Sequence, residues 1–220
     1  MNTEELKQFI LAIGSTNYAQ NRLTMVPADP TNHLEKCLRD VVVRGIEGDF
    51  AETGVWRGGL CMLAKQVFNE LNQNRKVFVI DSFEGLPQPD PKYPADNGDI
   101  HHTYKELAVS LDEVKENFRQ AGLLDDKVIF IKGWFKDTLP GPIEKLAILR
   151  LDGDMYSSTI EVLETLYSKL SVGGYCIIDD YFLHLGCQKA VNDFRAKEGI
   201  TSEIIKVCPN TNDEVHYWIK

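Results

Sequence analysis

The chain lacks the features that mark membrane-spanning, secreted and nucleic-acid-binding proteins. None of its apolar runs approaches the roughly 20 residues of a membrane-spanning helix. Residues 1–8 contain neither a basic stretch nor a long apolar core, so we expect no signal peptide and a cytoplasmic location. The formal net charge is -9 and no basic stripe is present, which argues against nucleic acid or an anionic membrane as partner.

Disulfide, zinc and common nucleotide-binding patterns are missing as well. The cysteines are odd in number, widely spaced and form no Cys-x-x-Cys pair, so we expect free thiols in a reducing compartment. Neither Gly-x-Gly-x-x-Gly nor Gly-Lys-Ser/Thr occurs. The histidines without an assigned role are interpreted as solvated loop residues: His101, His102, His184 and His216.

The order of the predicted elements indicates the fold class. With no repeat or long linker, residues 1–220 are expected to form one domain, with an N-terminal helical segment over 1–47 that contains helices at 3–13 and 32–46. Strands are then predicted at 49–53, 76–81, 127–132, 146–151, 174–178, 202–207 and 214–219, and helices at 59–71, 110–121, 159–170 and 187–197. Such alternation predicts an α/β fold, a mostly parallel sheet with helices on both faces and one antiparallel strand closing it. This is the outline of the class I methyltransferase (Rossmann-like) fold.

A proline-rich, irregular stretch at 84–104 follows the second predicted strand. Loops of this length in compact domains are functional lids or disordered segments. Its place beside the edge of the sheet where ligands bind favours a lid.

The turn after the first strand, Glu52-Thr-Gly-Val-Trp-Arg-Gly-Gly59, is the first candidate binding element. Glycines at such a turn let the backbone bend sharply and approach a ligand closely. An ordinary strand-to-helix turn has the same composition, so this motif alone does not decide between the two.

Asp81 ends the second strand, where a carboxylate can accept hydrogen bonds from a ribose diol. Together with the glycine turn it suggests a nucleoside-containing cofactor, although a solvated aspartate is the plainer alternative. Gly133 and Trp134 follow the third strand and offer aromatic surface for an adenine ring, but a lone tryptophan is more often part of a core.

Two acidic clusters stand at the ends of apolar strands and carry the strongest signal. Asp152 and Asp154 follow the fourth strand, and Asp179 and Asp180 follow the fifth. In parallel sheets these ends meet at one edge, where the carboxylates would repel one another unless a cation or a proton held them together. Oxygen ligands without neighbouring Cys or His favour Mg²⁺. The plainer alternative is that Asp154 caps the next helix and Asp180 is merely exposed.

These segments resemble the macrocin and mycinamicin type of sugar O-methyltransferase, a family that depends on S-adenosylmethionine and magnesium. The resemblance runs in order over roughly residues 20 to 219. The matching segments are 23–25, 48–59, 81–87, 110–118, 133–139, 149–154, 156–159 and 178–181, with Cys187, Ala190 and Val191.

The resemblance implies roles for a number of residues. Asp152, Asp179 and Asp180 would bind Mg²⁺, and Asp154 would be the general base. The residues implied to hold S-adenosylmethionine are Glu52, Thr53, Gly54, Trp56, Arg57, Gly58, Gly59, Asp81, Ser82, Ser110, Gly133, Trp134 and Asp152. Tyr18 and Met25 resemble positions near the acceptor. The acceptor would be a sugar or glycoside, with a deoxysugar on a natural product such as an antibiotic expected, and a homodimer or higher homo-oligomer is implied.

Three other functions fit part of the pattern. Asp152-Gly-Asp154 also matches the Asp-x-Asp motif of glycosyltransferases, which explains neither Asp179-Asp180 nor the glycine turn. A catechol could replace the sugar, because either scaffold offers vicinal oxygens. A non-catalytic binding protein on the same scaffold is disfavoured by the complete acidic set.

Overall fold

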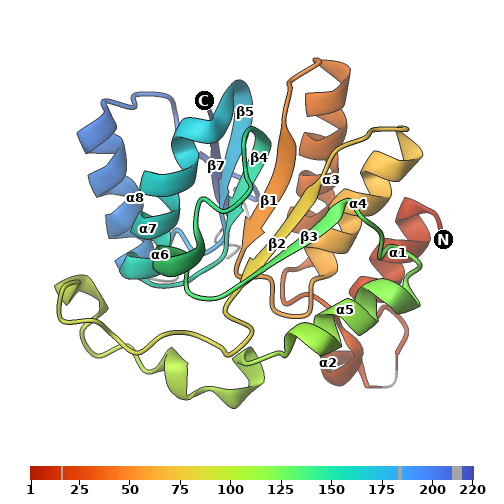
Figure 1. Ribbon diagram of the computed structural model, residues 1–220, viewed down its shortest axis with the longest axis horizontal. Helices are drawn as coiled ribbons and strands as arrows, with labels where there is room; N and C mark the ends of the chain where they lie inside the picture. The colour runs from red at the N-terminus through yellow and green to blue at the C-terminus, as the bar shows by residue number, and fades with distance from the viewer. Residues whose placement is uncertain (16, 183–184, 210–214) are drawn as a thin grey trace.

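A computed structural model describes residues 1–15, 17–182, 185–209 and 215–220 (Figure 1). Its centre is a seven-stranded sheet of order β3-β2-β1-β4-β5-β7-β6. The strands are β1 (Asp49–Thr53), β2 (Val77–Asp81), β3 (Val128–Lys132), β4 (Leu146–Leu151), β5 (Leu170–Ile178), β6 (Ile205–Lys206) and β7 (His216–Ile219). β7 pairs antiparallel with both β5 and β6, and the pairs among β1 to β5 are parallel, which confirms the predicted sheet.

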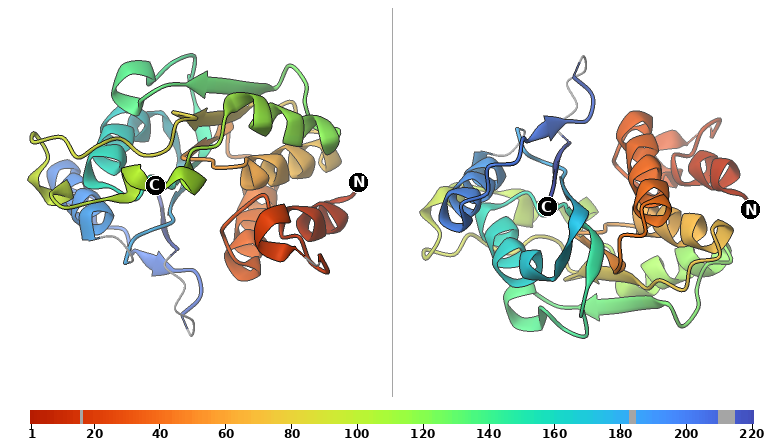
Figure 2. Two further views of the ribbon diagram at one scale, coloured as in Figure 1. Left: turned by 90° about the horizontal axis from the view of Figure 1, so that it is seen from below. Right: turned by 90° about the horizontal axis from the view of Figure 1, so that it is seen from above.

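Helices cover both faces of the sheet (Figures 1 and 2). The helices are α1 (Thr3–Ile10), α2 (Tyr18–Asn21), α3 (Ala28–Val43), α4 (Gly59–Glu70), α5 (Leu111–Gln120), α6 (Phe135–Thr138), α7 (Tyr156–Leu166) and α8 (Leu185–Glu198). α1, α3, α4 and α5 pack in one apolar cluster, and α7 and α8 pack in a second one on the opposite face. Successive residues of a strand point to opposite faces of the sheet. Phe50 therefore packs in the first apolar cluster and Ala51 in the second.

Several boundaries differ from the sequence-based expectation. α3 begins at Ala28, earlier than predicted, because Pro27 in extended backbone stands at its N-cap. α7 begins at Tyr156, and β5 already begins at Leu170. α2 and α6 were not predicted, since four-residue helices leave no periodic pattern. The antiparallel β7 does not close the sheet: the two-residue β6 pairs along its outer side.

The β2–α5 segment (residues 82–110) contains the predicted lid. It has no long element, only three short 3₁₀ turns at Pro94–Asp96, His101–Thr103 and Lys105–Leu107. It runs beneath the edge of the sheet at which the parallel strands end (Figure 1, yellow-green; Figure 2, left). The segment therefore covers the edge where a ligand is expected.

Side-chain states agree with the sequence analysis in part. All five cysteines are free thiols, as predicted, and Cys208 alone among them is not buried. The expectation that His216 is solvated is wrong: it is buried in β7, with its ring 4.8 Å from Tyr181 and 4.9 Å from Phe182. His184 and Glu214 lie outside the described residues. Within the described part of the chain, every helix is too short or too polar to cross a membrane.

His33 makes the stability of this fold depend on pH. It lies in α3 with its ring 4.7 Å from that of Tyr217, and burial lowers its pKa from 6.5 to about 4. Between these values the unfolded chain binds more protons than the folded one, so stability falls as pH falls from 6.5 toward 4. We expect His33→Phe, which keeps an aromatic ring, to reduce the loss of Tm between pH 7.5 and pH 5. An equal loss in both proteins would contradict this.

Candidate active site

A cavity lies at the carboxyl ends of β1 to β4. It is lined by Met25, Gly54, Trp56, Asp81, Ser82, Gly85, Leu86, Pro87, Gln88, Asp90, Tyr93, Leu107, Gly133, Trp134, Phe135, Lys136, Asp152, Gly153, Asp154, Ser157, Ser158 and Glu161. Residues from the N-terminal segment, the strand ends and the β2–α5 segment thus meet around one space. In open α/β sheets this is where ligands bind.

Gly54 brings the turn after β1 into contact with the end of β4. Its φ is +80°, and an added Cβ would stand 1.6 Å from the carbonyl oxygen of Asp152. Asp152 in turn donates its N–H to the carbonyl of Thr53 at 2.9 Å. Glycine is therefore required here by the neighbouring strand, and it places the predicted cofactor turn directly beside the predicted metal ligand.

Other residues of this turn do not line the cavity. Glu52 and Thr53 are buried in β1, and Gly58 is the N-cap of α4 with φ +84°. Arg57 donates to the carbonyl oxygens of Gln20 and Arg22 at 2.6 and 3.1 Å. The Gly59 N–H donates to the carbonyl of Leu23 at 3.0 Å. Arg57 and Gly59 thus hold the N-terminal segment, and direct contact of these five residues with a cofactor stays a prediction.

Trp56 connects the same turn to the β2–α5 segment. Its φ is +48°, in the left-handed region that non-glycine residues rarely adopt. Its indole Nε1 donates to the carbonyl of Glu106 at 2.8 Å, and the Arg57 guanidinium lies 4.6 Å from its ring centroid. The glycine turn is therefore the junction of three segments that surround the cavity.

Asp81 has the position expected of a ribose-binding carboxylate. Its two oxygens accept the backbone N–H groups of Val55, at 2.8 Å, and Phe83, at 2.7 Å. Burial raises the pKa of this carboxyl, and these hydrogen bonds oppose the rise. The carboxylate is thereby fixed at the wall of the cavity with lone pairs left for a hydroxyl.

Of the remaining predicted cofactor residues, three line the cavity and one caps a helix. Gly133 and Trp134 line the cavity, and the Gly133 N–H donates to the Asp81 carbonyl at 3.0 Å. Ser82 also lines it, with its hydroxyl donated to the carbonyl of Gly85 at 2.7 Å. Ser110 instead caps α5 by accepting the N–H of Glu113 at 3.2 Å, and its contact with a cofactor stays a prediction.

The main residue that the sequence analysis missed is Arg150, one residue before the carboxyl end of β4. Its guanidinium is buried and donates to Glu52 Oε1 at 2.6 Å, to Asp152 Oδ2 at 2.7 Å and to Asp179 Oδ1. Burial alone would lower the pKa of Arg150, but these carboxylates raise it well above its usual value. Part of the positive charge that was expected between the strand ends is thus supplied by Arg150. An arginine inside an otherwise apolar strand was the available signal.

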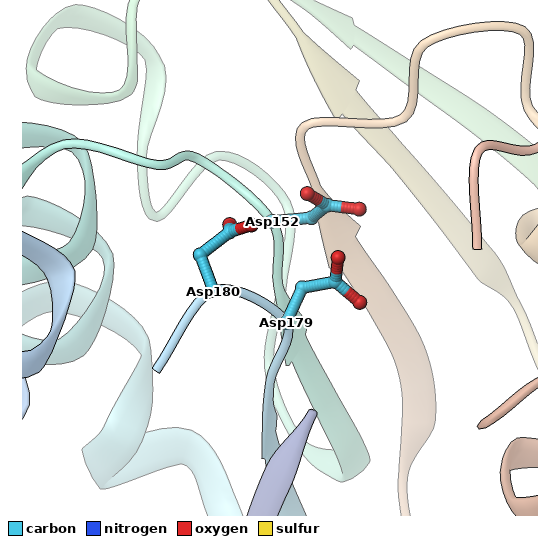
Figure 3. Close-up of side chains that lie close together, drawn as sticks. All are labelled: Asp152, Asp179 and Asp180. Atoms are coloured by element: carbon cyan, nitrogen blue, oxygen red, sulfur yellow. The ribbon is translucent and has the colours of Figure 1, made fainter. Parts of the chain in front are cut away.

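Asp152, Asp179 and Asp180 converge at the ends of β4 and β5 (Figure 3). One carboxylate oxygen of each lies within 4.8 Å of those of the other two. Burial and the carboxylates of Asp154, Asp152 and Asp179 together raise the pKa of Asp180 well above its usual value. Arg150 therefore does not offset the whole negative charge of the cluster, and the prediction that these residues lie together is confirmed.

Asp154 lies at the cavity wall in a strained conformation. Its φ is +56°, and its N–H donates to Asp180 Oδ2 at 3.3 Å. The alternative that Asp154 caps α7 is wrong, because Met155 occupies the N-cap position and the Asp96 carboxylate accepts the first helical N–H groups. Nor is Asp180 merely exposed, since it is 6% accessible.

Met25 and Tyr18 are the two residues predicted near the acceptor. Met25 is half-exposed and lines the cavity, and its contact with an acceptor stays a prediction. Tyr18 begins α2, but its side chain lies outside the part of the chain that the structure describes. Its contact with an acceptor stays a prediction.

Removing the positive charge of Arg150 tests the electrostatic account. Arg150→Met leaves three buried or partly buried carboxylates without their common cation, so we expect a loss of about 3–5 kcal/mol in the free energy of unfolding. Urea denaturation measures it. Arg119→Met, which removes an exposed pair with Glu116, is the matched control and should change stability by less than about 1 kcal/mol. A loss in Arg150→Met no larger than in the control would refute the role of Arg150.

Comparison with known proteins agrees with this geometry. The chain is 44% identical over 195 residues to the demethyldecarbamoylnovobiocin O-methyltransferase of Streptomyces niveus, covering 87% of this chain and 74% of that protein. It is also 44% identical over 190 residues to the mycinamicin III 3''-O-methyltransferase of Micromonospora griseorubida, covering 84% and 74%. The structure of the O-methyltransferase NovP superimposes with a TM-score of 0.92 at 37% identity, covering 99% of this chain and 97% of that one.

The model of the macrocin O-methyltransferase family matches residues 14–218, nearly the whole chain. The predicted fold class and the resemblance are both confirmed. The chain belongs to the macrocin O-methyltransferase (TylF) family and is an S-adenosylmethionine-dependent O-methyltransferase.

Proposed function

We propose that this enzyme methylates a sugar hydroxyl of a natural-product glycoside and requires Mg²⁺. One observation carries the proposal: Asp152, Asp179 and Asp180 converge beside a cavity that also contains Asp154 and the glycine turn. The names of its relatives support the acceptor class. One of them methylates the 4' position of a tetracenomycin that carries a rhamnosyl group.

The cavity wall formed by Gly54, Asp81 and Trp134 would hold S-adenosylmethionine. The cofactor supplies an activated methyl group when bound, so the protein has to position the acceptor and remove its proton. Asp81 would accept hydrogen bonds from the ribose, and Trp134 would offer its ring to the adenine. Gly54 lets this wall approach the end of β4, where the acceptor hydroxyl is expected.

Asp152, Asp179 and Asp180 would hold Mg²⁺. Their carboxylate oxygens are the hard ligands that this ion prefers, and the negative charge left over after pairing with Arg150 fits a divalent cation. The ion, when bound, lowers the pKa of a hydroxyl group beside it. Arg150 keeps two of the three carboxylates in place by holding Asp152 and Asp179.

Asp154 is the proposed general base. Its side chain belongs to the cavity wall next to the acidic cluster, and its backbone is held by the hydrogen bond to Asp180. From this position Asp154 would accept the proton of the sugar hydroxyl as its oxygen takes the methyl group from the sulfonium of the cofactor, which leaves as S-adenosylhomocysteine. Residues of the β2–α5 segment, among them Leu86 and Tyr93, would act as the lid that excludes water from the reaction.

We also propose a homodimer or higher homo-oligomer in the cytoplasm. The N-terminal segment exposes several apolar side chains, among them Phe9 at 39% and Ile13 at 61%, which a second subunit would cover. Five free thiols suit a reducing compartment.

Methyl transfer from labelled S-adenosylmethionine to a panel of acceptors tests the proposed function. The panel contains a rhamnosylated natural product, a simple catechol and a nucleotide sugar. We expect transfer to the glycoside alone, its loss on adding EDTA and its return with excess Mg²⁺. Transfer to the catechol would favour that alternative, and activity indifferent to EDTA would refute the metal requirement.

Asp154→Asn tests the proposed base. The amide keeps the size of the side chain but cannot accept the proton, so kcat should fall by about 10²–10⁴-fold. Calorimetry should show unchanged binding of S-adenosylhomocysteine and Mg²⁺. Asp126→Asn, at an exposed surface position, is the control. Full turnover of Asp154→Asn would exclude the assignment.

A further inference from the structure

Asp96 is a buried acid that has no part in the proposed chemistry. It ends the first 3₁₀ turn of the β2–α5 segment and is 3% accessible. Its Oδ1 accepts the N–H of Tyr156 at 2.7 Å, and its Oδ2 accepts the N–H of Ser157 at 2.9 Å. Asp96 does not line the cavity. It therefore uses both oxygens to bind the beginning of α7.

α7 depends on this distant residue for its cap. Met155 stands at the N-cap position and makes no side-chain hydrogen bond there. The N-cap residue therefore offers no side-chain acceptor for the first N–H groups of the helix. A carboxylate at a helix N-terminus also interacts favourably with the helix dipole. The contact fixes the start of α7, directly after Asp152-Gly-Asp154.

Asp154 is thereby held from both sides. Upstream its own N–H is bound by Asp180, and downstream the chain enters α7, whose first turn is bound by Asp96. A non-glycine residue at φ +56° keeps such a conformation only when its surroundings impose it. Without Asp96, the downstream constraint on the orientation of Asp154 would be lost.

The same contact positions the wall of the cavity contributed by the β2–α5 segment. Tyr93, which lines the cavity three residues before Asp96, has its ring 5.8 Å from that of Tyr156. α8 approaches the junction as well: a Cβ at Gly186 would stand 3.0 Å from the Tyr156 nitrogen and 3.2 Å from Asp96 Oδ1. Asp96 therefore lies where the segment meets the starts of both helices that follow the acidic clusters.

We propose that Asp96 is a positioning residue: by capping α7 it sets the orientation of Asp154 and joins it to the β2–α5 segment around the acceptor. The inference rests on the proposed function, because it assigns Asp96 to the base of that reaction. It predicts that the β2–α5 segment is fixed near residues 93–96, so that any opening of the lid takes place elsewhere along it.

Asp96→Ala and Asp96→Asn test this with the full chain. Steady-state methyl transfer should show kcat, counted per S-adenosylhomocysteine-binding site, reduced by about 10²-fold in Asp96→Ala, because a small displacement of a catalytic group costs that much. Asp96→Asn keeps one acceptor oxygen and should fall between this variant and the wild type. The Kd of S-adenosylhomocysteine should stay within about twofold, since its predicted ligands are not touched.

Hydrogen exchange gives a readout that does not depend on activity. Asp96→Ala should speed exchange of the amides at 153–158 and 85–93, while those of β1 and α4 stay unchanged. Gly186→Ala crowds the same junction without altering Asp96 and should lower kcat in the same direction. Gly186→Ala also tests the inference if Asp96→Ala does not fold.

Asn2→Ala is the matched control. It removes the cap of α1, where the Asn2 side chain accepts the Glu5 N–H at 2.9 Å far from the cavity. It should lower Tm and leave kcat unchanged. Wild-type kcat in Asp96→Asn and Gly186→Ala, or unchanged exchange at 153–158, would overturn the inference. If the wild type shows no methyl transfer while Asp96→Ala shows the expected changes in hydrogen exchange, the proposed function is overturned instead.

Discussion

The buried guanidinium of Arg150 is the interaction on which the active-site edge of the sheet depends. Carboxylates from the ends of β1, β4 and β5 would repel one another at this depth, and Arg150 binds one from each strand. The strand register makes this possible, because Glu52 in β1 stands directly beside Arg150 in β4. Asp180 and Asp154 lie next to this ion-pair cluster. Their additional carboxylates support the proposed divalent cation and the proposed base.

A second constraint is the turn after β1, which connects parts of the chain far apart in sequence. Arg57 holds the N-terminal segment that carries Met25, and Trp56 holds the β2–α5 segment at Glu106. The cavity is therefore enclosed by segments that share one support. A substitution in the turn should therefore alter both the expected cofactor site and the expected acceptor site.

The framework and the acidic cluster could be predicted from the sequence for a physical reason. Strands buried on both faces form apolar runs, and parallel strands end at one edge, so Asp152 and Asp179 had to come close. Arg150 was missed although it interrupts such a run. Asp96 gave no signal: it is 60 residues from Tyr156, inside an irregular segment, and only the folded chain brings them together. The turn at 52–59 indicated a place but not which of its side chains face the cavity.

The central claim is that Asp152, Asp179 and Asp180 bind a divalent cation beside the methyl donor. A crystal of the protein grown with S-adenosylhomocysteine and Mn²⁺, measured at the manganese absorption edge, tests it most directly. The account predicts one anomalous peak between these three carboxylates, next to the bound cofactor product. A fully occupied S-adenosylhomocysteine site with no peak there, or with a peak elsewhere, would contradict it.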